Sequence, residues 1–181
     1  MKYMNWTYER FEAIDTNSYI GCAKSHQQLS QIILDRNYDY AIVFEDDIYF
    51  MPYAKDLLCN IEKQLFDNSL KWDLIHFAPS IHRPLNKYND SFIDLSNPPP
   101  KNLEKHRGIY GTSGFILNKI ACKYIVEWNT DRFIQNSHEQ VPIDQYLDSI
   151  IYPALKCFCP ILPLIVQIPD YSDINLSLIH I

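Results

Sequence analysis

The sequence has 181 residues, enough for one domain with a hydrophobic core, and 47% of them are apolar. Thirteen tyrosines and nine phenylalanines exclude a disordered chain, while four glycines and eleven prolines exclude a fibrous or low-complexity protein. A formal net charge of −6, with scattered lysines and arginines, argues against a nucleic-acid-binding protein.

The first half of the chain predicts alternating strands and helices. A short strand is expected over residues 8–14, and apolar residues at helical spacing predict a helix over 21–36. Residues 40–44 form an apolar run rich in β-formers that ends at three carboxylates, which predicts a buried strand opening to solvent at its carboxyl end. A helix over 52–66 and a core strand over 73–77 follow.

The second half begins with a long excursion over residues 79–107, which holds three consecutive prolines and many charges. It is expected to be a loop or lid, with or without a small hairpin, or else disordered. The strand pattern resumes over 108–117. Asn118 is a candidate cap for the helix that follows, and a second helix is expected over 142–152. Residues 158–168 resemble a further strand.

This alternation predicts an α/β fold with a largely parallel sheet flanked by helices, formed by residues 1–181 as a single domain. Ligands of such sheets bind beyond the carboxyl ends of the strands, which is where the three carboxylates fall. The location of the acids therefore already suggests a binding site.

The cysteines and the ends of the chain bear on the compartment. Five cysteines, an odd number and mostly far apart, predict free thiols in a reducing compartment and no disulfide framework. The first residues lack an apolar signal core, and no stretch reaches the roughly 18 apolar residues that span a bilayer. We expect a soluble, cytoplasmic protein without a transmembrane segment, and a peripheral position at a membrane stays open.

Glu45, Asp46 and Asp47 are the sharpest local signal. Adjacent carboxylates repel one another, and a hard divalent cation such as Mg²⁺ or Mn²⁺ would relieve this repulsion while binding substrate phosphates. The alternative is an exposed acidic turn before the next helix. The tripeptide alone does not decide between these interpretations.

The surrounding motifs carry a family resemblance. The segment 21–26, Gly-Cys-Ala-Lys-Ser-His, followed by a helix and then by a strand ending in Glu-Asp-Asp at 45–47, resembles glycosyltransferase family 25. That family includes bacterial lipooligosaccharide galactosyltransferases and procollagen galactosyltransferases. Similar motifs follow in order at Trp72-Asp73, 110–118, Pro142-Ile-Asp144 and 167–174, so the resemblance covers roughly residues 10–174.

The resemblance implies a GT-A fold, a nucleotide-diphospho-sugar donor and a divalent metal, usually Mn²⁺. Asp46 and Asp47 would then bind the metal and Glu45 would position the site. The expected reaction moves a hexose, galactose or glucose, from a UDP-sugar to a hydroxyl of a glycan or of hydroxylysine. The expected partners are therefore a nucleotide-sugar and a glycan or protein acceptor.

Each remaining candidate has a functional and a structural interpretation. The resemblance places Ser25 and His26 beside the donor pocket, but both residues could instead fix the start of their helix. Asp144 is the candidate general base for the acceptor hydroxyl, or an acid that complements a helix N-terminus. Gly111 and Gly114 suit close approach of the backbone to the donor, or a turn or bulge.

One part of the family pattern is not found: a first strand and an arginine-bearing helix that help to hold the nucleotide. Without this unit a strand edge would be exposed, which predicts a homo-oligomer, unless residues 1–7 cover that edge. The alternative function is a non-catalytic remnant that keeps the fold and the acidic site. A carboxylate-pair glycoside hydrolase is a third hypothesis.

Overall fold

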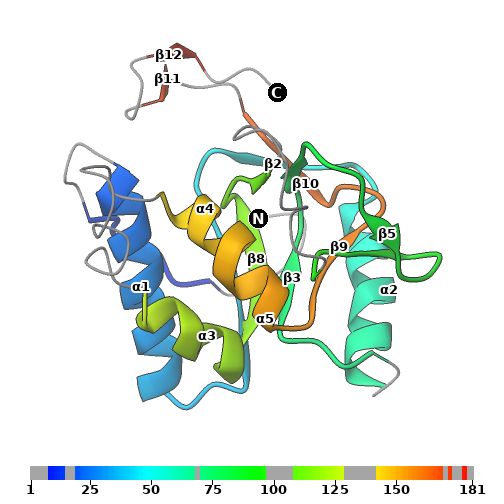
Figure 1. The fold of residues 1–181 in the computed structure, drawn as a ribbon, viewed down its shortest axis with the longest axis horizontal. Helices are drawn as coiled ribbons and strands as arrows, with labels where there is room; N and C mark the ends of the chain where they lie inside the picture. Colours follow the sequence, from blue (N-terminus) through cyan, green and yellow to red (C-terminus); the bar gives the residue numbers. More distant parts are fainter. Residues whose placement is uncertain are drawn as a thin grey trace.

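Helices cover both faces of a central sheet in the computed structural model (Figure 1). The residues that it describes are 8–14, 19–67, 70–96, 108–128, 142–168, 171–172 and 177–178. The α/β class expected from the sequence is confirmed.

The central sheet contains six of the described strands, in an order that differs from their order in the sequence. From one edge to the other they are β1 (Tyr40–Phe44), β8 (Gly114–Asn118), β3 (Leu74–His76), β9 (Cys157–Pro160), β6 (Phe92–Asp94) and β5 (Asn86–Lys87). Three two-stranded ribbons accompany the sheet: β2 (Ile48–Phe50) with β10 (Ile165–Gln167), β4 (Ser80–Ile81) with β7 (Ile109–Tyr110), and β11 (Tyr171–Ser172) with β12 (Ser177–Leu178).

The expectation of a largely parallel sheet is wrong for the described strands. Only β3 and β9 pair in parallel, and the other pairings of the central sheet are antiparallel. Helical connections do give β1, β3 and β9 a common direction, but β8 lies between β1 and β3 and runs the opposite way. The alternation of strands and helices along a sequence does not reveal such an insertion.

Most predicted elements are present close to their expected bounds. The helical segments are α1 (Tyr19–Asp35), α2 (Ala54–Phe66), α3 (Lys119–Val126), α4 (Ile143–Tyr146), the π-helical stretch η3 (Leu147–Ile151) and α5 (Tyr152–Ala154). Asn118 caps α3 as predicted, because its side-chain oxygen accepts hydrogen bonds from the backbone N–H groups of Ile120 and Ala121.

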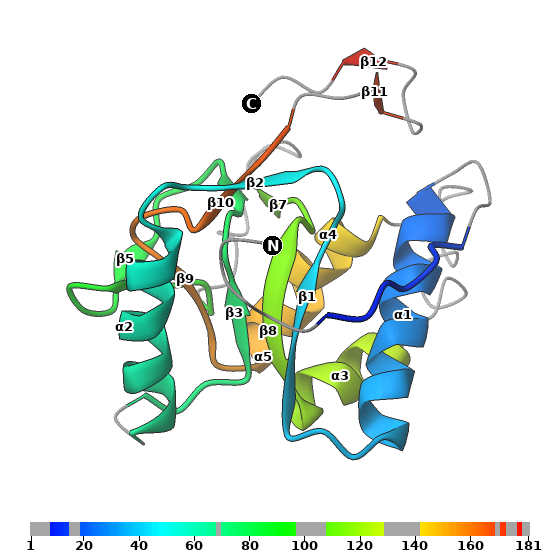
Figure 2. The ribbon, with the colours of Figure 1, turned by 180° about the vertical axis from the view of Figure 1, so that it is seen from behind.

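Residues 8–14 do not form the predicted strand. They run as irregular chain beside α1, where the Ile14 N–H donates to Ser25 Oγ at 2.8 Å and Arg36 pairs with Glu9. Figure 2 shows this dark blue segment running from beside β1 across α1. The segment is thus bound by side chains of α1 and of the residue after it, and not by the backbone hydrogen bonds of a strand.

The strand over 40–44 is confirmed with the predicted bounds, but it is not buried as expected. β1 lies at the edge of the described sheet, so Tyr40 and Ile42 are 42% and 37% exposed and Val43 is the buried side chain of the strand. Residues 1–7, the alternative cover for this edge, lie outside the described residues.

The excursion over 79–107 contains secondary structure in its described part. β5 and β6 form a hairpin that extends the sheet beyond β9, and the side chains of Phe92 and Leu95 are fully buried. Residues 97–107, which hold the three prolines, lie outside the described residues.

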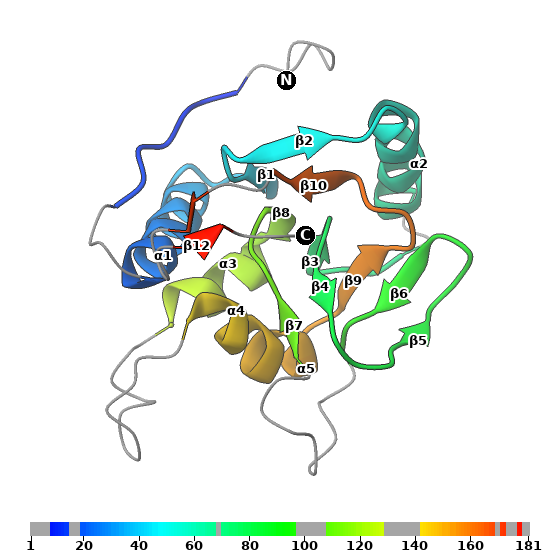
Figure 3. The same cartoon turned by 90° about the horizontal axis from the view of Figure 1, so that it is seen from above.

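Two hydrophobic layers hold the sheet between the helices. One layer packs α1, α3 and the α4–α5 segment against one face of the sheet, with Leu117, Ile125 and Tyr152 in its interior. The other packs α2 and the β2–β10 ribbon against the opposite face. Figure 3 shows both layers from above, on either side of the strands.

Two findings concern the cysteines and the possibility of a membrane-spanning helix. All five cysteines are free thiols, as their number and spacing predict. Within the described part of the chain, no helix combines the length and apolar character needed to cross a bilayer.

Candidate functional site

Residues from several segments meet at the end of the sheet where β1 finishes. The first half of α1, the turn after β1, the loop between β7 and β8, and α4 all approach this end (Figure 3). The backbone N–H of Glu45 donates to the Ser113 carbonyl at 3.0 Å, which joins the turn to the β7–β8 loop. The carboxylate triplet therefore lies at the carboxyl end of a strand, as predicted.

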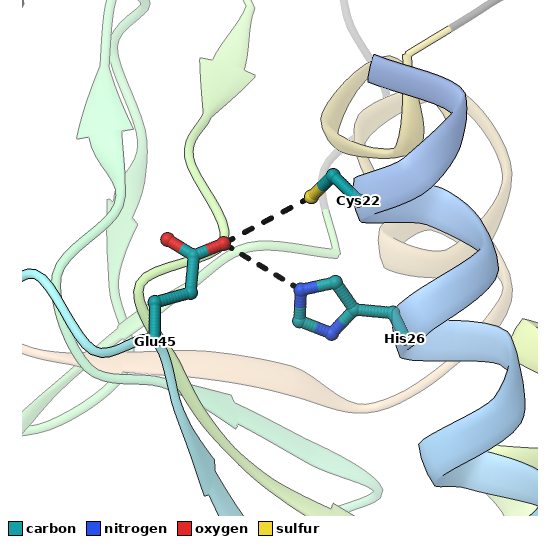
Figure 4. A group of neighbouring side chains, drawn as sticks. All are labelled: Cys22, His26 and Glu45. Atoms are coloured by element: carbon teal, nitrogen blue, oxygen red, sulfur yellow. Dashed lines mark hydrogen bonds and ion pairs between the residues drawn. The ribbon is translucent and has the colours of Figure 1, made fainter. Parts of the chain in front are cut away.

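Glu45 is the centre of a compact polar cluster (Figure 4). Its Oε1 atom accepts a hydrogen bond from Thr112 Oγ1 at 2.6 Å and lies 3.6 Å from His26 Nε2. Cys22 Sγ lies 3.9 Å from the same oxygen and 3.8 Å from Thr112 Oγ1. Cys22 and His26 are four residues apart on α1, so both side chains point from one face of the helix toward the carboxylate.

Two opposing effects act on His26, which is only 6% exposed. Burial disfavours the charged imidazolium, but hydrogen bonds with Cys22 and Glu45, together with the Glu45 charge, raise the His26 pKa to about 9. Burial also acts to raise the pKa of Glu45, and His26 and Thr112 hold it below its usual value. At neutral pH the two residues therefore form an ion pair.

Ser25 serves the backbone in this structure. Its hydroxyl donates to the Gly21 carbonyl one turn earlier at 2.8 Å and accepts from the Ile14 N–H. These bonds tie residues 8–14 to the start of α1. The geometry therefore agrees with the structural interpretation of Ser25, and its predicted place beside a donor stays a prediction.

The two aspartates of the triplet have surroundings different from those of Glu45. Asp47 Oδ2 accepts a hydrogen bond from Gln167 Nε2 at 2.7 Å, and its carbonyl accepts from the Ile168 N–H at 2.6 Å. Asp47 Oδ1 is buried and has no hydrogen-bond partner, while Asp46 is exposed. Burial and the charges of Glu45 and Asp46 raise the pKa of Asp47 despite the Gln167 bond.

An unpartnered buried carboxylate oxygen is costly, and a cation would remove that cost. Asp47 offers this oxygen, and the exposed Asp46 offers a second carboxylate from the adjacent position. Hard divalent cations bind through one or two carboxylates and complete their shell with water and phosphate oxygens. These two residues therefore fit a Mg²⁺ or Mn²⁺ ion in chemistry and in number.

Asp144 reaches the same end of the sheet from the first turn of α4. It is half-buried, and its carboxylate accepts hydrogen bonds from the backbone N–H groups of Gln145, at 2.8 Å, and Gly111. Burial raises the pKa of Asp144, these bonds lower it, and the charge of Glu45 raises it, with a net increase. A carboxyl with a raised pKa is better suited to accept a proton than an ordinary surface aspartate.

Asp148, one helical turn beyond Asp144, has a different environment. It forms a buried ion pair with Arg83, with Nη1 at 2.7 Å from Oδ1, and this pair joins η3 to the segment after β4. Burial raises the Asp148 pKa while the Arg83 charge lowers it. The pairing gives Asp148 a structural role and leaves Asp144 as the carboxylate directed to the site.

The two candidate glycines have separate local explanations. Gly111 has a φ of +94°, and a side chain there would meet nothing within 4 Å, so its backbone conformation is what requires glycine. At Gly114 a Cβ atom would lie 2.7 Å from Ile165 and 2.8 Å from Phe44. The close approach at Gly114 is thus to protein side chains, and donor contact by either glycine stays a prediction.

Sequence reasoning did not select Cys22, Thr112 or Gln167 as site residues. The i, i+4 spacing of Cys22 and His26 was a usable signal, since such residues share a helix face. Thr112 and Gln167 contact the acids only through the tertiary fold, at separations of 67 and 120 residues. No local pattern distinguishes them.

Sequence comparisons place the chain among glycosyltransferases. Residues 2–147 match the family described as "Glycosyltransferase family 25 (LPS biosynthesis protein)". The chain belongs to glycosyltransferase family 25, as its motifs predict.

Three relatives illustrate the similarity and its extent. "Procollagen galactosyltransferase 1" of Danio rerio is 24% identical over 153 residues, which cover 79% of this chain and 24% of that protein. A "Putative glycosyltransferase" of Haemophilus influenzae is 26% identical over 165 residues, which cover 87% of this chain and 46% of that protein. "Procollagen galactosyltransferase 2" of Homo sapiens is 24% identical over 150 residues, which cover 79% of this chain and 23% of that protein. The chain thus spans less than half the length of each.

Proposed function

We propose that this chain forms the donor side of a metal-dependent glycosyltransferase with a GT-A-type sheet, and that it transfers galactose or glucose from a UDP-sugar to a hydroxyl group. The observation that carries the proposal is the buried, unpartnered Oδ1 of Asp47 beside the exposed Asp46 at the carboxyl end of β1. Membership in the family supports the reaction class.

In this proposal Asp46 and Asp47 hold Mn²⁺ or Mg²⁺. A bound ion would supply positive charge that neutralises the departing diphosphate. Gln167 fixes the Asp47 carboxylate by its hydrogen bond to Oδ2, so that Oδ1 would be the oxygen available to the ion. Asp47 is therefore positioned before the donor binds.

Asp144 is the proposed general base. It takes the proton of the acceptor hydroxyl while that oxygen forms a bond to the anomeric carbon of the sugar, and the bond from this carbon to the UDP oxygen breaks. The N–H groups of Gln145 and Gly111 orient its carboxylate, and its raised pKa favours proton acceptance. The Arg83 pair keeps the neighbouring Asp148 out of this role.

The names of the relatives suggest two acceptor classes for the test: hydroxylysine in a collagen-like peptide and a hydroxyl of a bacterial glycan. Each is offered with UDP-galactose or UDP-glucose.

The experiment measures UDP release from each donor with Mn²⁺ and with a chelator, first without and then with the acceptors. We expect release that requires Mn²⁺ and rises with the correct acceptor, and that falls strongly in Asp47→Asn. Asp90→Asn is the matched control, because Asp90 is exposed on the β5–β6 hairpin at the far edge of the sheet. Metal-independent release would indicate a hydrolase, and no release by a folded protein that also fails to bind UDP would contradict the proposal.

A further inference from the structure

The Glu45 cluster contains three different metal-ligating groups that the proposed donor site does not explain. Within the described residues, Cys22, His26 and Glu45 are a group whose ligand atoms all lie within 4.8 Å of one another. We propose that Cys22 Sγ, His26 Nε2 and Glu45 Oε1 form a binding site for Zn²⁺ or a similar thiolate-binding cation, separate from the site at Asp46 and Asp47.

The spacing of these atoms agrees with tetrahedral coordination. Bonds of about 2.3 Å to sulfur and about 2.0 Å to nitrogen and oxygen place neighbouring tetrahedral ligand atoms about 3.3–3.7 Å apart. The observed distances to Glu45 Oε1 are 3.6 Å from His26 Nε2 and 3.9 Å from Cys22 Sγ. Both distances to Glu45 are within a few tenths of an ångström of the tetrahedral range, and the separation of Cys22 Sγ and His26 Nε2, at most 4.8 Å, would have to shorten by no more than about 1.5 Å.

The three ligands are already oriented by the fold. Cys22 and His26 project from consecutive turns of α1, while the Glu45 backbone is hydrogen-bonded to Ser113 and its Oε1 to Thr112. The ring of His26 is also held edge-on against Phe115, with centroids 5.8 Å apart. A site whose ligands are fixed before the ion arrives loses little conformational entropy on binding.

Accessibility indicates how the ion would enter and what would complete its shell. His26 is buried, but Cys22 and Glu45 are only partly buried, so the cluster faces solvent on their side. Three protein ligands leave one tetrahedral position, which is the arrangement of zinc sites that bind water or a substrate oxygen. Thr112 Oγ1 lies 3.8 Å from the sulfur and donates a hydrogen bond to Glu45 Oε1 at 2.6 Å.

Ligand chemistry separates this site from the donor site. Thiolate and imidazole select Zn²⁺ and Co²⁺, whereas Mn²⁺ and Mg²⁺ prefer carboxylate and phosphate oxygens. In such a site a cysteine binds the ion as its thiolate and a histidine binds it through a neutral imidazole nitrogen. The inference does not depend on the proposed transferase activity, since it uses neither the proposed metal-binding residues Asp46 and Asp47 nor the proposed base Asp144.

The test uses Co²⁺ as a spectroscopic probe for Zn²⁺. Co²⁺ is added to the whole, metal-free chain, and absorption is recorded in the near ultraviolet, where thiolate-to-cobalt charge transfer appears, and in the visible, where tetrahedral Co²⁺ absorbs. We expect both bands, their loss when Zn²⁺ is added, and no displacement by the same concentration of Mg²⁺. A wild-type chain without the charge-transfer band would overturn the inference.

Variants identify the ligands. Cys22→Ser should abolish the charge-transfer band and lower Zn²⁺ affinity at least about 100-fold, and His26→Gln should lower the affinity by a similar factor. Cys59→Ser is the matched control, because Cys59 is exposed on α2 on the other face of the sheet, and it should keep both bands. Asp47→Asn should also keep them. If Cys22→Ser remains folded by circular dichroism and keeps the full band, the sulfur ligand lies elsewhere and the proposal is wrong.

Discussion

The carboxylates at the two ends of the central sheet differ in how completely they are hydrogen-bonded. At the start of β3, Asp73 accepts from the side chain of Asn118 and from the Lys156 N–H, each at 3.0 Å. At the end of β1, Asp47 has one carboxylate oxygen bonded to Gln167 and the other buried without a partner. Asp73 therefore stabilises the fold through satisfied hydrogen bonds, whereas Asp47 keeps one buried oxygen without a hydrogen-bond partner, as the proposed metal ligand would.

This difference also explains the "W-D" motif of the family in this chain. Asn118, which caps α3 with its side-chain oxygen, donates its side-chain N–H groups to Trp72 O and Asp73 Oδ1. The motif therefore joins β3, β8 and the segment before β9 at the end opposite the site. The Trp72-Asp73 motif of the family therefore has a structural explanation in this chain, in hydrogen bonds that join three segments of the fold.

The largest expected effect concerns the proposed chemistry. Asp144→Asn removes the proton acceptor and should lower the transfer rate by about 10²–10⁴-fold, while UDP affinity and stability stay near those of the wild type. Steady-state transfer and UDP titration on the same preparation measure both quantities. Equal losses of rate and donor affinity would assign Asp144 to the donor instead.

The opposite end of the sheet should respond in stability. Asp73→Ala leaves the Lys156 N–H and the Asn118 side chain without their acceptor, and should lower the free energy of unfolding by about 2–3 kcal/mol. Urea unfolding measures this loss. Asp90→Ala, which removes an exposed acid paired with Lys87, should leave the midpoint unchanged. An Asp73→Ala protein as stable as the wild type would remove the distinction between the two ends.

The Glu45 cluster should differ from Asp73 and Asp144 in making the stability of the fold depend on pH through His26. The His26 pKa is raised to about 9 in the folded state, so the folded chain holds this proton more tightly than the unfolded chain. Its stabilising contribution, roughly 1–3 kcal/mol, is fully present below pH 6.5 and is lost as the pH rises through about 9.

Unfolding of wild type and His26→Gln in the presence of a chelator, at several pH values, measures this contribution as the difference between the two curves. His82→Gln changes an exposed histidine and is the control. A difference that does not shrink between pH 6.5 and 9 would show that His26 does not titrate as described.

The smallest expected effect is a slight gain in the stability of the metal-free protein when Asp47 is replaced. Burial raises the pKa of Asp47, so its ionised carboxylate destabilises the metal-free fold at neutral pH. Asp47→Asn should therefore increase the melting temperature slightly in chelator, by an amount corresponding to less than about 1 kcal/mol. This gain should vanish near pH 3, where the wild-type carboxyl is protonated in both states. A marked loss of stability would make Asp47 an ordinary structural acid like Asp73.

The sequence predicted much of the local structure and less of its assembly. Periodicity located α1 and α2, the Asn118 cap located α3, and the apolar run before the acids located β1 with its bounds. Strand order was not predictable, because the insertion of β8 between β1 and β3 depends on contacts remote in sequence. The exposure of Tyr40 and Ile42 follows from this order and was missed with it.

For the candidate site, too, local features were predictable from the sequence and tertiary contacts were not. The carboxylates of Glu45 to Asp47 were identifiable because clustered charge at a strand end is a local signal. Their different partners were not, because Thr112 and Gln167 reach them across the fold. The sequence therefore located the three acids at the end of a strand, but not the separate hydrogen-bond partners of Glu45 and Asp47.

The central claim is that Asp47 is reserved for a metal-bound nucleotide, and calorimetric titration of UDP in Mn²⁺ tests it most directly. We predict that wild type and Asp90→Asn bind UDP only with Mn²⁺ present, and that Asp47→Asn binds at least about 10-fold more weakly while its melting temperature in chelator is unchanged or slightly higher. Equal affinity of wild type and Asp47→Asn for Mn²⁺ and UDP would contradict the claim.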